Sequence, residues 1–420
     1  MLLSGNFGLE KEMLRITADG HFAHTQHPFA VNDENITRDF CENQTEINTP
    51  IFKSAEGVVE NIGNLTRRIR DRLATLSPRE LLWQYSNPPY IAGEDDIPIA
   101  RFYGERSAKT AYRHHLAQRY GRYMMTLSGI HFNYSFAGDL LRRNYEVETG
   151  IRVVKGQEPD DYREYCDRIY LHLASRLVAY GWVMVALTAA SPLMDGSFFE
   201  ADRAGENAFC GMASVRCSEL GYWNEFTPIL EYDNTERYTQ SIQRYVDEGL
   251  IAAPSELYYP IRLKPKGENS LDALRSNGVN HIELRMIDVN PLRPEGIDIH
   301  DVKFAQLLIV WLTAQTPHRL TPPEQTTAVA NFKNAARYDL RTSGIVDERG
   351  HRVELTSALR NVLDEMSAFF SQFGENADVE QTLAYQQRKL QQPKAYRYAD
   401  IVRSKYADGL VKHLLADISL

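Results

Sequence analysis

The stretch FGLEKEMLRI at residues 7–16 decides the fold class, because it suits a β-strand and carries acidic side chains two residues apart. Residues two apart in a β-strand share a face, so Glu10 and Glu12 are expected on one side and apolar groups on the other. The same alternation recurs in three further segments: Glu42, Gln44 and Glu46 opposite Cys41 in 39–47, His131 and Asn133 in 127–135, and His281, Glu283 and Arg285 in 281–287. Residues 258–264 also suit a strand. The sequence thus predicts several strands with a polar and an apolar face.

Helical periodicity follows in other parts of the chain. Apolar residues recur at helical spacing in residues 55–76, 160–190 and 302–313, and the chain from about residue 322 consists of helices broken at Gly374 and Pro393. Strands and helices come in mixed order without a regular βαβ alternation, which favours an α+β fold with a largely antiparallel sheet. No repeat or flexible linker divides the sequence. We therefore expect residues 1–420 to form a single domain, with a core at about 7–320 and a helical C-terminal part at about 321–420.

Composition excludes two classes of partner. The 420 residues carry 47 basic and 56 acidic side chains, a formal net charge of −9. A nucleic-acid binder or a polybasic membrane-surface protein would need the opposite balance. The apolar segment 177–194 continues a helix with charged residues and predicts a buried core helix. The four cysteines form no CxxC pair, and the opening residues do not have the pattern of a leader peptide, so we expect a cytoplasmic protein.

The polar strand faces allow two interpretations. Alternating strands usually present a solvated face, and each segment taken singly fits that reading. Taken together, the faces hold short acidic side chains with one His and one Arg, and clustered carboxylates repel one another unless a cation lies between them. Carboxylates with one imidazole suit Mg²⁺, with Mn²⁺ as the alternative, and such ions commonly bridge nucleotide phosphates. Zinc is disfavoured, since the sequence has neither HExxH nor CxxC.

A nucleotide would have to bind without a glycine-rich phosphate loop. The sequence contains no GxxxxGK[ST], no GxGxxG after a strand and no kinase signature. Metal ions and basic side chains would hold the phosphates instead. Arg285, Arg262 and Lys264 are the candidate donors, although ordinary surface charge explains the last two equally well.

Seven segments in order resemble a known family, bacterial glutamate–cysteine ligase (γ-glutamylcysteine synthetase). They span about residues 7–297, and they read FGLEKEMLRI, ITRDFCENQTEINTP, YSNPPYI, AYRHHLAQRYG, LSGIHFNYS, SVRCSELGY and GVNHIELRMIDVNPLRPEGI. The resemblance implies a glutamine-synthetase-like antiparallel sheet curved into a funnel and flanked by helices. It also implies an ATP-dependent ligase, in which glutamate is activated as γ-glutamyl phosphate and then joined to cysteine, the first step of glutathione synthesis.

The resemblance also implies roles for individual residues. Glu10, Glu12, Glu46, His131 and Glu283 match metal-binding positions, with Asp39 as a further member. Arg285 matches the arginine near the transferred phosphoryl group and, with Glu283, forms the expected catalytic pair. Substrate carboxylates would contact Arg113 and Arg216, and the cysteine side chain would occupy a pocket of Phe40, Tyr112, Leu116 and Tyr222, whose residues alone would suggest only core packing.

Three alternatives stay open at this point. The acceptor pocket could take another small amino acid, because a methylene distinguishes substrates by only about 1–3 kcal/mol. The same site could serve a related metal-dependent phosphotransferase, or a regulatory homologue without chemistry. The family's N-terminal extension and a fused ATP-grasp domain are not found in this sequence, so the expected product is the dipeptide.

Overall fold

The computed structural model describes residues 2–104 and 107–419, and a sheet of seven strands runs through this part of the chain. The strand order is β2-β3-β1-β5-β9-β8, with β4 pairing a further part of β1, and every pairing is antiparallel. This arrangement confirms the predicted α+β class. The strands of the sheet are β1 Gly5–Thr17, β2 Ile36–Arg38, β3 Gln44–Asn48, β4 Glu80–Trp83, β5 Gly129–Phe136, β8 Ile261–Pro265 and β9 Val279–Asp288. Two small pairs lie outside it: β6 Met194–Asp195 with β7 Asn207–Ala208, and β10 Gly344–Val346 with β11 Arg352–Glu354.

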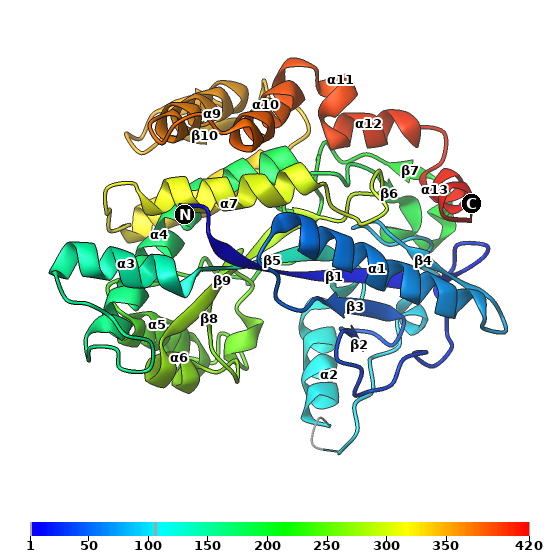
Figure 1. The fold of residues 1–420 in the computed structure, drawn as a ribbon. Coiled ribbons are helices and arrows are strands. Elements are labelled where there is room, and N and C mark those ends of the chain that lie inside the picture. The colour runs from blue at the N-terminus through cyan, green and yellow to red at the C-terminus, as the bar shows by residue number, and fades with distance from the viewer. Residues whose placement is uncertain (1, 105–106, 420) are drawn as a thin grey trace.

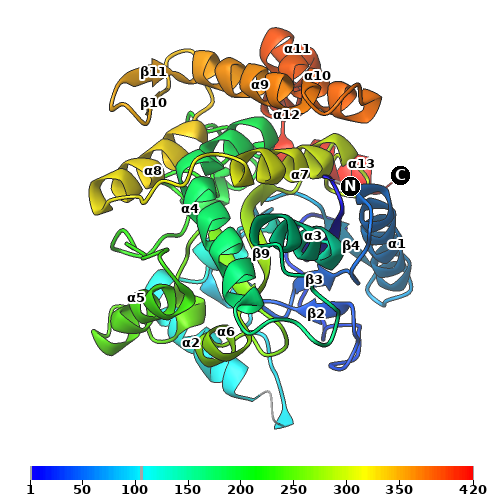
Figure 2. The same ribbon diagram turned by 60° about the vertical axis from the view of Figure 1, so that its left-hand side comes forward.

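Helices cover one face of this sheet in two layers (Figures 1 and 2). The layer next to the sheet contains α1 Ala55–Ala74, α4 Tyr162–Thr188 and α7 Ile299–Thr313. The C-terminal helices lie over this layer, while α2 Ala108–Tyr120 projects from the opposite side of the sheet. The remaining helices are α3 Gly138–Thr149, α5 Thr235–Asp247, α6 Leu271–Asn277, α8 Pro322–Ala335, α9 Leu355–Ser371, α10 Ala377–Gln391, α11 Pro393–Tyr396, α12 Tyr398–Lys405 and α13 Leu410–Ser419.

The apolar strand faces form the core against these helices. Leu9, Phe132 and Leu284 come from three neighbouring strands, have at most 1% of their surface exposed, and belong to one cluster with side chains of α1, α4 and α7. Each such side chain contributes roughly 1.5–3 kcal/mol when it leaves water. Because the pleat alternates, burial of these residues directs Glu10, His131 and Glu283 to the face opposite the helical layers.

Helix α4 is the only helix of the described residues that is long and apolar enough to cross a membrane. Within its most apolar window, 78% is buried inside the protein. This confirms the prediction of a core helix for the apolar segment. The four cysteines form no disulfide.

Two strand predictions need correction. Residues 39–47 do not form one strand: Asp39 N–H donates to the Gln44 carbonyl and Gln44 N–H to the Cys41 carbonyl, so a tight turn separates β2 from β3. Glu42 lies in this turn and pairs with Arg38 at 3.3 Å, so it does not share a strand face with Glu46. The period-2 rule failed here because it cannot detect a turn made by polar residues. Similarly, β8 begins only at Ile261, after a 3-10 turn at Pro254–Glu256.

The C-terminal layer is fastened to α7 by a buried ion pair. Lys389 Nζ of α10 lies 2.6 Å from Asp301 Oδ1 of α7, and both side chains are at most 2% exposed. The carboxylate also accepts hydrogen bonds from Gln386 at 2.9 Å and Tyr398 at 2.8 Å. Removing one partner of such a pair leaves an uncompensated buried charge, which commonly costs about 3–5 kcal/mol. This network joins the C-terminal helices to the helices that cover the sheet.

The ionisation of His27 makes the stability of the fold depend on pH. Burial, with Arg15 and Arg38 nearby, lowers the pKa of His27 to about 3 from its ordinary value of 6.5. Below pH 6.5 the unfolded chain therefore binds a proton that the folded chain excludes, so this group removes stability as the pH falls from 6.5 toward 3. We expect the loss to approach about 1.4 kcal/mol per pH unit. Denaturant unfolding of wild type and His27→Gln at several pH values in this range checks this. The free energy of unfolding should fall less steeply with decreasing pH in the variant, and an equal pH dependence in both proteins would contradict the assignment.

Candidate active site

The register of the sheet brings the predicted polar faces together. Glu10 on β1 pairs with His131 on β5, and Glu12 pairs with Glu46 on β3. Asn133 on β5 pairs with Glu283 on β9, which in turn pairs with Arg262 on β8. Groups from five strands, far apart in the sequence, therefore meet on the face opposite the helix layers. This result makes a merely solvated face an insufficient description, because the groups converge.

Three of these residues form a compact set of potential metal ligands. Ligand atoms of Glu10, His131 and Glu283 all lie within 4.8 Å of one another. His131 Nδ1 is 2.9 Å from Glu10 Oε2 and 3.9 Å from Glu283 Oε1. His131 Nε2 and Glu283 Oε1 are buried and have no hydrogen-bond partner among the described residues. Buried polar atoms normally have partners, so these two fit the ligands of a divalent cation.

Basic groups flank this set on the side of β8 and β9. Lys264 Nζ lies 3.3 Å from Glu283 Oε1, and Arg285 Nη1 lies 3.3 Å from Glu283 Oε2. The Lys264 contact is electrostatic, since its geometry does not make a hydrogen bond. Glu283 is fully buried, whereas the two cations keep part of their surface exposed. Glu283 thus orients two positive groups whose exposed ends can hold an anionic ligand.

The carboxylates of the cluster fall into two groups, one with pKa values below normal and one with pKa values above normal. Burial alone would raise the pKa of Glu283, but Arg285, Lys264 and His131 hold it well below its ordinary value. Burial also raises the pKa of Glu10, yet the hydrogen bond with His131 gives a net pKa below normal. In contrast, burial raises the pKa of Glu12 and, well above its usual range, that of Glu46, with neighbouring carboxylates adding to the latter. The Glu12–Glu46 half therefore has excess negative charge that favours a bound cation.

Asp39 completes this acidic half from the turn before β3. Its charge acts on the pKa of both Glu12 and Glu46, so the three carboxylates lie close together. Asp39 is also paired with Arg113 of α2, whose Nη2 lies 3.8 Å from Asp39 Oδ1 and whose Nε–H donates to the Asp39 carbonyl. The structure thus places Asp39 at the junction between the cluster and α2.

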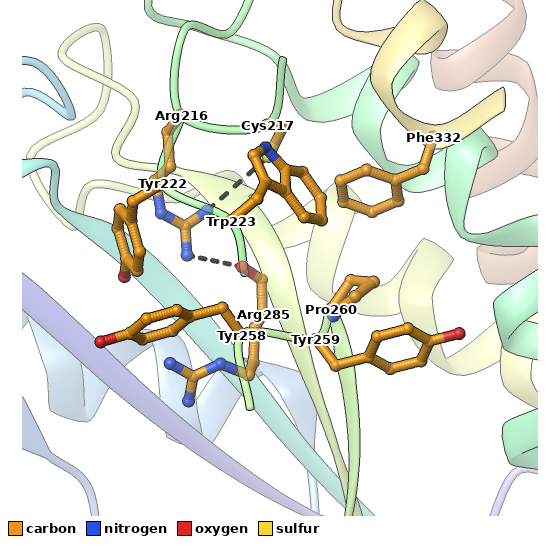
Figure 3. A pocket seen from close by; sticks show the side chains of 9 residues that line it. All are labelled: Arg216, Cys217, Tyr222, Trp223, Tyr258, Tyr259, Pro260, Arg285 and Phe332. Atoms are coloured by element: carbon orange, nitrogen blue, oxygen red, sulfur yellow. Dashed lines mark hydrogen bonds between the residues drawn. The ribbon is translucent and has the colours of Figure 1, made fainter. Parts of the chain in front are cut away.

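A pocket opens beside Arg285 at one end of the cluster (Figure 3). The hydroxyls of Tyr222 and Tyr258 and the guanidinium of Arg285 turn to the same side, while Tyr259 points away. Arg216 Nη2 donates to the Arg285 carbonyl at 2.5 Å, and its Nε is buried without a partner among the described residues. Arg216 and Arg285 both line this pocket together with aromatic rings, a combination that suits a carboxylate-bearing ligand.

Gly129 makes room for Arg216. A Cβ atom at this position would lie 2.2 Å from Arg216 Cζ, so any side chain would displace the guanidinium. The Gly129 N–H donates to Glu12 Oε2 at 2.8 Å, which holds that carboxylate in place. Sequence reasoning missed Gly129; the signal available was a glycine at the start of a strand, which marks a close approach.

The predicted side-chain pocket assembles in part. Phe40 and Leu116 are buried in one cluster, and Tyr112 packs against it. Tyr222 belongs to a neighbouring cluster but meets Tyr258 edge to face, with ring centroids 4.8 Å apart. Tyr258, which sequence reasoning did not select, bridges the two clusters, and its buried hydroxyl has no hydrogen-bond partner among the described residues. In the sequence, two adjacent tyrosines before β8, Tyr258 and Tyr259, could have drawn attention to this residue.

Arg262 occupies a different place from Lys264. Its Nη2 donates to the carbonyls of Ser255 at 2.8 Å and Leu257 at 2.7 Å. The guanidinium therefore holds the turn that precedes β8, and a role in phosphate binding stays a prediction. Burial and the nearby Arg285 lower the pKa of Arg262.

A second hollow lies at the other end of the cluster, beyond Glu10. Its lining is mostly uncharged and includes Asn6, Gly8, Thr49 and Ser135, but Glu10 of the cluster also lines it. Gly8 contributes no side chain, so the strand backbone forms part of the floor. Along the sheet, a mostly uncharged hollow, an acidic cluster and an arginine pocket thus follow one another.

Comparisons with known proteins identify the family of this chain. A family model described as glutamate-cysteine ligase matches residues 1–250 and 246–335. The glutathione biosynthesis bifunctional protein GshAB of Listeria monocytogenes is 32% identical over 98% of this chain and 53% of its own length, so this chain spans about half of that relative. The glutamate–cysteine ligase of Clostridium acetobutylicum is 33% identical over 74% of this chain and 72% of its own length.

A solved structure shares the fold. Glutamate–cysteine ligase from Francisella tularensis in complex with AMP superposes with a TM-score of 0.86 at 22% identity, covering 99% of this chain and 88% of that one. This likeness shows that the sheet and its helical layers form a known architecture. By the family match and the relatives together, the chain belongs to the glutamate–cysteine ligase family.

Proposed function

We propose that the protein joins the γ-carboxylate of glutamate to the amine of a small amino acid, with cysteine as the favoured acceptor, at the expense of ATP. The observation that carries this proposal is the convergence of Glu10, His131 and Glu283 within 4.8 Å, with Arg285 beside them. Family membership supports the same conclusion.

The first step transfers the γ-phosphoryl group of ATP to glutamate. The bond between the γ-phosphorus and the β,γ-bridging oxygen breaks, a bond from a γ-carboxylate oxygen of glutamate forms, and ADP leaves with the electron pair. Negative charge spread over the phosphoryl oxygens is stabilised by fixed positive groups, and Arg285 and Lys264, which both contact Glu283, would supply them. Bound Mg²⁺, held by Glu10, His131 and Glu283 and on the acidic side by Glu12, Glu46 and Asp39, would neutralise the triphosphate.

The second step forms the amide. The acceptor nitrogen attacks the carbonyl carbon of the acyl phosphate, the carbon–oxygen bond to phosphate breaks, and the amine loses a proton. Arg113 and Arg216 would hold substrate carboxylates, and the leaving phosphate can accept the proton that the amine releases. Phe40, Tyr112, Leu116, Tyr222 and Tyr258 would enclose the acceptor side chain.

The order of these regions along the sheet supports one orientation of bound ATP. Its nucleoside would occupy the mostly uncharged hollow at Gly8, so that the γ-phosphate points toward Arg285. A Cβ at Gly8 would meet only Asn133 Cβ, at 3.5 Å, an ordinary contact that the fold can accept. We expect Gly8→Val to raise KM for ATP by about tenfold with KM for glutamate unchanged, and Gly8→Ala to have a smaller effect. Steady-state kinetics check this, and an equal change in both KM values would contradict the placement.

The acceptor is tested by measuring ADP release with ATP, Mg²⁺, glutamate and a panel of small amino acids, with product masses determined in parallel. We expect γ-glutamylcysteine, with cysteine among the best acceptors by kcat/KM. A better acceptor of similar size would correct the substrate but keep the ligase. Phosphorylated product without an amide would instead identify a phosphotransferase.

We further propose that residues 1–420 act as one catalytic domain in the cytoplasm. The buried pair Asp301–Lys389 supports the first point, because it ties the C-terminal helices to α7. The unpaired cysteines and the acidic net charge support the second.

A further inference from the structure

Helix α2 carries Tyr112, Arg113 and Leu116, but little apolar burial holds it to the rest of the protein. Leu116 is the only fully buried residue of this helix, while Tyr112, Ala117 and Tyr120 pack partly buried against the same cluster. Figure 1 shows the helix projecting from the side of the sheet opposite the helical layers. One fully buried leucine contributes roughly 1.5–3 kcal/mol, which is a modest anchor for a helix of this length. Polar contacts therefore contribute to where the helix lies.

Besides the pairing of Arg113 with Asp39, three residues of α2 contact one carboxylate. Glu256 is fully buried in the 3-10 turn before β8. Its Oε1 lies 3.1 Å from Arg119 Nη1 and accepts a hydrogen bond from Tyr120 at 2.9 Å. Its Oε2 lies 3.3 Å from His115 Nε2 and accepts from the Ala252 N–H at 2.7 Å. Three residues on one face of α2 thus contact a single side chain.

The same turn is connected to the other parts of the acceptor pocket. Asn224, two residues after Tyr222, donates to the Glu256 carbonyl at 2.9 Å and accepts from the Tyr258 N–H at 2.8 Å. Tyr258 packs on Tyr120 with ring centroids 5.1 Å apart. Arg262 holds the turn from the sheet side through the carbonyls described above.

We propose that Glu256 is a positioning residue that sets the closure of α2 over the acceptor site, an inference that rests on the proposed ligase function. Glu256 lies apart from the metal-ligand set and acts through Tyr112 and Arg113, which α2 carries. Burial and Glu256 raise the pKa of Tyr120 to about 12, so its hydroxyl remains a donor to the carboxylate at neutral pH. If α2 were less firmly held, acceptor binding would weaken, whereas phosphoryl transfer, which depends on residues of the sheet, would continue.

The test compares the kinetics of wild type, Glu256→Gln and Arg119→Met with ATP, Mg²⁺, glutamate and L-cysteine or L-2-aminobutyrate. We expect Glu256→Gln to raise KM for the amino-acid acceptor by about tenfold or more, because a displacement of about 1 Å has effects of this size. KM for ATP and glutamate should stay within about twofold. Formation of γ-glutamyl hydroxamate with hydroxylamine, a small acceptor that does not need the pocket, should be retained.

Asp301→Asn is the matched control, because it also neutralises a buried carboxylate that accepts several hydrogen bonds. Asp301 belongs to α7 in the helical layers, away from α2. It should lower the melting temperature without a selective rise in acceptor KM. Equal changes in all KM values for Glu256→Gln, or the same kinetic pattern in the control, would overturn the proposal. If Glu256→Gln does not fold, Arg119→Met decides by the same criteria. Absence of glutamate-dependent ADP release in wild type would instead refute the proposed function itself.

Discussion

Replacing Glu283 with Gln is expected to lower kcat/KM for ADP formation by about 1,000-fold while the fold is retained. The substitution preserves shape but removes a charge that lies 3.3 Å from both Lys264 and Arg285. It also removes one of the three potential ligands that lie within 4.8 Å of one another. Both the placement of the basic groups and the affinity for a divalent cation should therefore fall.

Asp167→Asn provides the control for this variant. Asp167 is a buried carboxylate of α4 that accepts a hydrogen bond from the Val279 N–H at the start of the same strand, β9. Its neutralisation should affect stability with little effect on turnover. ADP release, circular dichroism and Mg²⁺ titration of the free protein separate the two outcomes. Wild-type turnover in Glu283→Gln would disprove the assignment of this cluster as the active site.

Replacing Gly129 with Ala is expected to lower kcat/KM for the amino-acid substrates by about 100-fold. The new methyl group would lie 2.2 Å from Arg216 Cζ and 2.4 Å from its Nη2, so the guanidinium must move from its position beside Arg285. Overpacking of this kind costs about 1–3 kcal/mol in stability, which the fold should tolerate. KM for ATP should change little, because the hollow proposed for its nucleoside lies at the other end of the cluster.

A double-mutant cycle shows whether Gly129 acts through Arg216. In an Arg216→Met background, Gly129→Ala should have little further effect on kcat/KM, because the displaced group is already absent. Gly93→Ala serves as the control glycine, since no atom lies within 4 Å of a Cβ placed there. If the effects of the two substitutions were fully additive, Gly129→Ala would not act through displacement of Arg216.

The period-2 pattern predicted the faces of β1, β5 and β9 because each has one face buried against helices. Burial forces Leu9, Phe132 and Leu284 inward, and the pleat then fixes the orientation of their charged neighbours. The pattern failed at residues 39–47, where hydrogen bonds within a short turn outweigh alternation. Register between strands, which brings Glu10 opposite His131, is a property of the assembled sheet and follows from no single segment.

The missed residues share one physical cause. Gly129, Tyr258 and Glu256 act through space, by admitting a guanidinium, bridging two clusters or receiving three side chains of a helix. None of these relations has a spacing in the sequence. Phe40 and Leu116 would have been assigned to the core from their residue types alone, and only the family resemblance singled them out.

The position of α2 outside the sheet has a consequence for how this kind of enzyme can be altered. The groups proposed to handle phosphate are built into hydrogen-bonded strands, where a change in one disturbs its neighbours. The helix that carries Tyr112 and Arg113 is instead attached through side chains, to Glu256 near its end and to Asp39 through Arg113. Under the proposed function, exchange of this helix together with its receiving turn should change the choice of acceptor more than phosphoryl transfer. Variant libraries confined to these two segments would test this.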